Sequence, residues 1–156
     1  MKDTKELEVF KVGEITVQRI VEHEIPVYHP SDWFVEATPE AIDPYRKWLE
    51  PKALCPATGL MIMPVQSYLV RTRHHWILID TCCGGEKSYA EPSEWHQPAN
   101  RIWLQNLMAV GVTPADIDYV FCTHLHSDHC GWNTRLIDGR WVPTFPNAKY
   151  VFARDE

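Results

Sequence analysis

The sequence predicts a layered α/β fold, and three observations support this prediction. Apolar residues alternate with polar ones through residues 9–20 and 61–70, as in half-buried strands. An amphipathic helix is predicted for residues 97–110. A run rich in histidine follows a short apolar strand at residues 121–133. Because ligand sites of α/β proteins lie at the carboxyl ends of strands, the same prediction locates a candidate site.

The N-terminal third predicts a β-hairpin followed by a long loop. Residues 9–12 and 15–20 alternate on either side of Gly13, which suits a tight turn. From residue 23 to residue 59 six prolines interrupt any pattern, so we expect an elaborated loop. Inside it, Asp43 followed by Pro44 predicts the start of a short helix, with Asp43 as N-cap.

The middle of the chain predicts two more strands and the main helix. Residues 61–70 and 76–79 are strands joined by a turn at residues 72–75, so we expect a mainly antiparallel sheet. The helix ends before Gly111, which is placed as its C′ residue. Its apolar face, which must lie on the sheet, consists of Ala99, Ile102, Trp103, Leu107 and Val110.

Three short elements complete the prediction. Thr113 and Pro114 begin a second, short helix. Residues 119–122 form a buried strand that carries the histidine-rich run at its carboxyl end. Residues 149–152 form a last strand.

Length and composition favour one domain over residues 1–156, because 156 residues with 45% hydrophobic content suffice for one core. The net charge of −6 and the scattered basic residues argue against nucleic acid as a partner. No apolar leader and no bilayer-length apolar run is present, so we expect a cytoplasmic protein without a membrane partner. Five cysteines without a C-x-x-C pair are expected to stay reduced.

The histidine-rich run has the spacing of a metal site. His124 and His126 lie two residues apart, so an extended chain directs both imidazoles to one side. Asp128 and His129 follow a turn that brings a carboxylate and a third imidazole to a neighbouring point, and Gly131 allows close backbone approach. Nitrogen and oxygen ligands suit zinc, and also iron or manganese. The alternative is an exposed polar loop.

This His-x-His-x-Asp-His run resembles the signature of the metallo-β-lactamase-fold hydrolases. Residues 76–85, a strand that ends in Asp80 before a glycine turn, resemble a second segment of that superfamily, and residues 111–118 resemble its lead into the ligand strand. Residues 23–60 match no family pattern.

The resemblance implies an αββα sandwich of two similar halves, of which this chain carries the first. The superfamily's remaining ligands, a histidine, a bridging aspartate and a final histidine, would come from a second half. We therefore expect a domain truncated at its C-terminus and inactive by itself, or a natural half-domain. In a half-domain one sheet face is open unless two copies pair as a homodimer.

The resemblance also assigns roles. His124 and His126 would hold a first metal, and Asp128 and His129 a second, with two zinc ions in the complete protein. The implied reaction is hydrolysis of a small ester, lactone or phosphoester by a metal-bound hydroxide, with Asp128 as the catalytic residue that orients the water or passes its proton. The long aromatic loops are most similar to those of the lactonase and organophosphate-hydrolase group.

Two other functions stay open. A relative with one iron can oxidise persulfides, and a half-fold can bind metal without catalysis. Diiron flavoproteins carry glutamate where this chain has His126, which argues against them.

Several flanking residues have two interpretations. Asp80 either orients the ligands or caps the glycine turn. Cys122 and Cys130 are expected to be buried thiols and not ligands, and Trp132 lines the pocket or belongs to the core. Solvated loop positions are expected for His23, His29, His74, His75 and His96.

Overall fold

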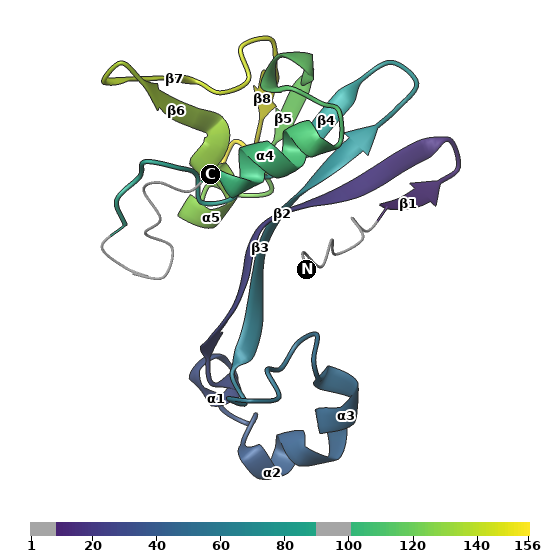
Figure 1. The fold of residues 1–156 in the computed structure, drawn as a ribbon, viewed down its shortest axis with the longest axis vertical. Coiled ribbons are helices and arrows are strands. Elements are labelled where there is room, and N and C mark those ends of the chain that lie inside the picture. The colour runs from purple at the N-terminus through teal and green to yellow at the C-terminus, as the bar shows by residue number, and fades with distance from the viewer. Residues whose placement is uncertain (1–8, 90–100) are drawn as a thin grey trace. The chain divides into compact units, whose positions relative to one another are not determined.

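The computed structural model describes residues 9–89 and 101–156 (Figure 1). The chain divides into two compact units, one built from residues 1–22 and 65–156 and the other from residues 23–64. Strands β2 (Ile15–Tyr28) and β3 (Met61–Arg71) contain residues of both units. The candidate metal ligands all lie in the first unit.

A six-stranded sheet in the order β1-β2-β3-β4-β5-β8 confirms the predicted α/β class. The other strands of this sheet are β1 (Val9–Val12), β4 (Trp76–Ile79), β5 (Tyr119–Phe121) and β8 (Lys149–Val151). β1 pairs with β2 and β3 with β4 in antiparallel fashion, as the two predicted hairpins require. β5 lies between β4 and β8 and is parallel to both. The sheet is therefore mixed, and the predicted antiparallel character holds only for its first half.

Helix α4 (Ile102–Ala109) supplies the main contact to the core of this unit. Trp103 and Leu107 are fully buried. The Trp103 ring stacks on Trp132 at 5.8 Å between centroids and meets Phe145 edge-on at 6.0 Å. The prediction that Ile102 faces the core is wrong, because this first residue of α4 is 52% exposed. The predicted helix start at residues 97–100 and the face residue Ala99 lie outside the described residues.

The two faces of the sheet differ in burial. Leu78 pairs with Val120 and both are fully buried in the cluster that contains Trp103. In the next register line Phe121 pairs with Val151, and these side chains are 44% and 41% exposed. One face thus carries the core, while the other presents apolar side chains to the outside.

Short elements surround the sheet. The short helix predicted after Thr113 is a 3₁₀-helix, η3 (Pro114–Asp116), in which Asp116 accepts hydrogen bonds from the Thr113 backbone and hydroxyl. A separate hairpin, β6 (Thr134–Ile137) and β7 (Arg140–Pro143), was not predicted. Its turn has Asp138 and Gly139 at positive φ, and an Asp-Gly pair between apolar residues is a strong hairpin signal.

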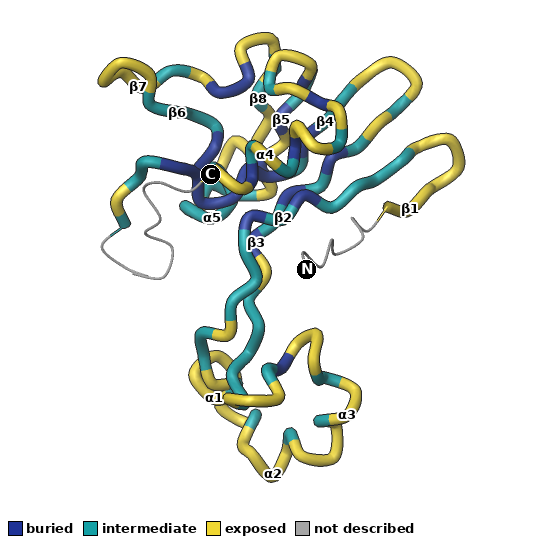
Figure 2. The backbone as a smooth tube through the Cα atoms, viewed as in Figure 1, coloured by how far each residue is buried: buried dark blue, intermediate teal, exposed yellow. Residues whose placement is uncertain are grey.

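The second unit is more regular than the loop predicted for residues 23–59. β2 continues through Pro26 to Tyr28, and the short helices are α1 (Pro30–Trp33), α2 (Pro39–Ile42), η1 (Asp43–Tyr45) and α3 (Arg46–Leu49). Thr38 caps α2, whereas Asp43 lies inside the helical run and not at an N-cap. Most of this unit is exposed or half-buried (Figure 2).

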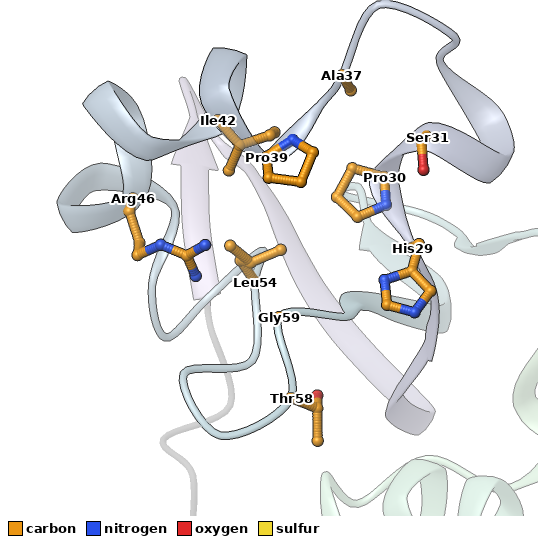
Figure 3. Close-up of a pocket in the computed structure, with 10 residues that line it drawn as sticks. All are labelled: His29, Pro30, Ser31, Ala37, Pro39, Ile42, Arg46, Leu54, Thr58 and Gly59. Atoms are coloured by element: carbon orange, nitrogen blue, oxygen red, sulfur yellow. The ribbon is translucent and has the colours of Figure 1, made fainter.

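A small cavity of about 180 Å³ lies within the second unit, lined among others by His29, Pro39, Arg46 and Leu54 (Figure 3). The Arg46 guanidinium bonds to Asp43 and Glu50, so its charge is already balanced by its own neighbours. His23, expected to be solvated, is instead half-buried in β2, and burial lowers its pKa.

Within residues 9–89 and 101–156, the structure contains no helix long and apolar enough to cross a membrane.

Candidate metal centre

The histidine-rich run begins where β5 ends (Figure 1). The chain leaves the sheet at Cys122 and forms a one-turn helix, α5 (Ser127–Cys130), and a 3₁₀ turn, η4 (Gly131–Asn133). His126 precedes α5 in an extended conformation, and its carbonyl accepts the amide of His129 at 3.0 Å. This is the turn that the spacing predicted, and it folds Asp128 and His129 back toward the strand end.

The three imidazoles of the run lie side by side. The ring centroids of His124 and His126 are 4.7 Å apart, and those of His124 and His129 are 3.8 Å apart. His126 is exposed and the other two are half-buried, so the cluster is open to solvent on one side. A ligand or ion can therefore reach it without movement of the core.

Asp80, which follows β4, accepts several hydrogen bonds within the cluster. Its carboxylate accepts the Thr123 amide at 2.7 Å and the Thr123 hydroxyl at 2.8 Å. The same carboxylate lies 2.8 Å from Nδ1 of His129, which must carry the proton to donate to it. Asp80 is only 8% exposed and adopts φ 57°, a conformation that Asp and Asn tolerate. Its carboxylate orients the cluster instead of capping the glycine turn.

Thr123 orients a second imidazole, that of His124. Its single hydroxyl proton goes to Asp80, so its oxygen can accept from Nδ1 of His124 at 3.1 Å. Both His124 and His129 then leave the Nε2 lone pair free for a ligand. Outer hydrogen bonds of this kind are how proteins fix the tautomer of metal-binding histidines.

The environment of His129 favours a cation. With Nδ1 facing Asp80, Nε2 lies 3.3 Å from a carboxylate oxygen of Asp128. This second contact is attractive when Nε2 carries a positive charge, from a proton or from a bound metal ion. Zinc, iron or manganese fits this nitrogen and oxygen donor set.

The predicted ligands are adjacent but do not converge on one point. In the part of the chain that the structure describes, no three His, Cys, Asp or Glu side chains have the geometry of a metal site. The reason is visible in the rings, since His124 and His129 are close and tilted by 44°, so that they pack on one another. Ligation of one ion by both imidazoles would require these side chains to rotate.

Backbone hydrogen bonds join the run to the loop after β4. The Thr81 amide donates to the His129 carbonyl at 2.7 Å, the Gly131 amide to the Cys82 carbonyl at 2.7 Å, and the Trp132 amide to the Thr81 carbonyl at 2.8 Å. A Cβ on Gly131 would lie 1.9 Å from the Cys83 carbonyl oxygen. The close approach predicted for Gly131 is confirmed, and its partner is the residue 82–83 backbone.

The cysteines around the site behave as neutral thiols. Cys130 Sγ donates to the His126 carbonyl at 3.3 Å, and Cys122 Sγ accepts from Asn133 Nδ2 at 3.3 Å. Burial raises the pKa of both thiols. Cys122 is buried as predicted, whereas Cys130 is half-buried, and that neither is a metal ligand stays a prediction.

Sequence reasoning missed two residues and left one open. Thr123 was not singled out, although a hydroxyl between a strand and a histidine is a usual hydrogen-bond partner. Glu22 gave no signal beyond an acidic residue in an apolar strand, yet it is 3% exposed. Trp132 is fully buried and belongs to the core and not to a pocket mouth.

The mixed sheet with a histidine and aspartate cluster at the end of a parallel strand defines a layered α/β protein with a candidate metal centre. The metallo-beta-lactamase superfamily matches residues 61–154, and the chain belongs to this superfamily. A comparison with curated proteins gives no match.

Three solved structures share the fold. The hydrolase AbOPH of the beta lactamase superfamily is 22% identical with a TM-score of 0.67, and the alignment covers 96% of this chain and 45% of that one. The dizinc quorum-quenching lactonase AidC is 20% identical with a TM-score of 0.68, covering 92% and 43%. A probable metal-dependent hydrolase from Staphylococcus aureus is 24% identical with a TM-score of 0.67, covering 94% and 50%. The present chain thus spans half or less of the length of these structures.

We predict that Gly131→Ala strongly destabilises the fold, because the added methyl overlaps the Cys83 carbonyl. The expected loss in the free energy of unfolding is about 3 kcal/mol or more, measured by denaturant titration. Gly13→Ala is the control, since Gly13 has φ 61° but open space around its Cβ position, and should cost only about 1 kcal/mol. Equal losses in the two variants would contradict the steric argument.

We predict that Asp80→Asn weakens zinc binding by about 10- to 100-fold, because it removes the carboxylate that sets the tautomers of His124 and His129. Chelator competition measures the affinity. Asp116→Asn is a matched control, because Asp116 accepts the amide and hydroxyl of Thr113 as Asp80 accepts those of Thr123. Similar zinc affinity in both variants would refute the role of Asp80.

Proposed function

We propose that the protein is a metal-dependent hydrolase of a small ester, lactone or phosphoester. The observation that carries the proposal is His129, held between the carboxylates of Asp80 and Asp128 with the imidazole of His124 against it. Superfamily membership and the hydrolase neighbours support the same class. The lactonase neighbour favours a lactone or related ester within that class.

In this proposal His124 and His126 hold a first ion, and Asp128 with His129 holds a second, with zinc as the preferred metal and iron or manganese as alternatives. A bound divalent metal supplies an activated water and polarises the substrate oxygen. Ligands from a further part of the protein would complete the coordination shells.

The chain's own residues have distinct tasks. Asp80 and Thr123 accept from Nδ1 of His129 and His124, so in the neutral rings the lone pair is on Nε2. Asp128 lies beside His129 Nε2 and is 23% exposed, so its carboxylate can accept a proton from the attacking water and pass it to the leaving group. The exposed side of His126 leaves room for a small substrate.

The double variant His124→Ala/His126→Ala should lose zinc binding, because it removes two of the three clustered imidazoles. Isothermal titration on the metal-stripped protein at its natural length measures the loss. His74→Ala/His75→Ala is the control, since it also removes two neighbouring histidines, here from the exposed turn between β3 and β4. Unchanged zinc stoichiometry in the first variant would exclude the run as the metal site.

Activity is tested on chromogenic esters, lactones and phosphotriesters with the protein at its natural length, reconstituted with zinc, manganese or iron. We expect turnover that a chelator abolishes and that Asp128→Ala lowers by about 100-fold or more, as for a group that moves a proton in the transition state. Circular dichroism should show that the variant keeps its fold.

Two other outcomes would change the assignment. A folded, metal-loaded protein that hydrolyses none of these compounds but consumes oxygen with a persulfide is an iron dioxygenase. Activity in neither assay leaves a metal-binding module without catalysis.

A further inference from the structure

Glu22, in strand β2, carries a carboxylate that the proposed reaction does not use. The side chain is 3% exposed, which is uncommon for glutamate. Its Oε2 accepts the Cys83 backbone amide at 2.9 Å, and its Oε1 accepts the Trp132 indole N–H at 2.7 Å. Each carboxylate oxygen therefore has a donor of its own.

These two donors belong to residues 80–84 and 129–133, the two segments that backbone hydrogen bonds join beside the imidazoles. Cys83 follows Cys82, whose carbonyl accepts the Gly131 amide, and Trp132 follows Gly131. Glu22 therefore bridges the loop after β4 and the turn after α5 at the point of their closest contact. Cys83 lies 61 residues after Glu22 in the chain and Trp132 lies 110 residues after it, so a single side chain joins three distant parts of the sequence.

The bridge continues to the candidate ligands through short steps. Trp132, held by Glu22, donates its backbone amide to the Thr81 carbonyl, and Thr81 donates its own amide to the His129 carbonyl. His129 follows Asp128 directly. Through these hydrogen bonds, the position of the Glu22 carboxylate affects the position of the backbone at Asp128 and His129.

An apolar side chain would fill the same space at lower electrostatic cost. Burial raises the pKa of Glu22, and the hydrogen bonds from Cys83 and Trp132 act in the opposite direction. Leucine at this position would leave the Cys83 amide and the Trp132 indole without an acceptor. A carboxylate offers a separate acceptor oxygen to each of these two donors.

We propose that Glu22 is a positioning residue of the candidate metal centre: it sets the backbone distance between residues 80–84 and 129–133, and with it the angle at which Asp128 and His129 face an ion. This inference rests on the proposed function, but its structural part can be tested without metal.

The test compares Glu22→Gln with Ser67→Ala. Glutamine keeps the size of the side chain but has one acceptor, so one donor faces an NH₂ group. Ser67 is the matched control because its hydroxyl accepts the indole of Trp103, the ring that stacks on Trp132, at 3.0 Å. Each variant thus removes an acceptor from one buried indole of the same stacked pair. Ser67 meets residues 80–84 at the Cys82 side chain, 3.2 Å from Sγ, whereas Glu22 accepts the backbone amide of Cys83.

Three measurements are made on the protein at its natural length. We expect Glu22→Gln to weaken zinc binding by about 10- to 100-fold and to change the visible spectrum of the cobalt(II)-substituted protein, whereas Ser67→Ala leaves both within about twofold of the parent. In the metal-free protein, Glu22→Gln should speed hydrogen exchange at the amides of Thr81, Gly131 and Trp132 at least tenfold more than Ser67→Ala does.

The outcomes separate the two proposals. Equal effects of Glu22→Gln and Ser67→Ala on zinc affinity, cobalt spectrum and amide exchange would overturn the positioning role. A parent protein that binds neither metal would overturn the proposed function, and amide exchange alone would then decide whether Glu22 fixes the two segments.

If Glu22→Gln does not fold, Trp132→Phe provides a second test, because it removes the indole donor to Glu22 and leaves a smaller aromatic ring at this buried position. It should reproduce the loss of zinc affinity, and parent-like affinity in this variant would refute the proposal.

Discussion

The close contact between residues 80–84 and 129–133 is the constraint on which the candidate site depends. Gly131 has no side chain because the Cys83 carbonyl occupies the place of its Cβ, and a Cβ on Gly84 would lie 2.6 Å from the Gly131 carbonyl carbon. Buried backbone groups must be paired, and here the two segments pair with each other. This contact brings Asp80, from the end of one parallel strand, to His129, beyond the end of the next.

Two acidic residues serve this arrangement in different ways. Asp80 is at the edge of the imidazole cluster and accepts from Thr123 and His129. It therefore helps to fix which ring nitrogen of the candidate ligands carries a proton. Glu22 is deeper and accepts from a backbone amide and an indole, so its proposed role is to position the backbone. Carboxylates are costly to bury, and each is retained where two or more donors converge.

The start of the superfamily match and the end of the second structural unit lie at nearly the same place in the chain. The match begins at residue 61, and the second unit covers residues 23–64. The sequence pattern of residues 23–60 resembled no family, and the structure gives this segment its own short helices and a cavity (Figure 3). The candidate ligands and the residues that orient them all belong to the other unit.

The sequence by itself determined the local elements and the identity of the candidate ligands. Alternation predicted β1 and β3, and a short continuous apolar run predicted β4. The glycine after α4 predicted its end, and four potential ligands within six residues predicted the cluster, because all of these depend on neighbours in the chain. Only the tertiary structure decided the parallel pairing of β4, β5 and β8, the contact of Asp80 with His129 and the burial of Glu22. These contacts join residues 30 to 110 positions apart, and no local propensity specifies which distant strand or donor a residue will meet.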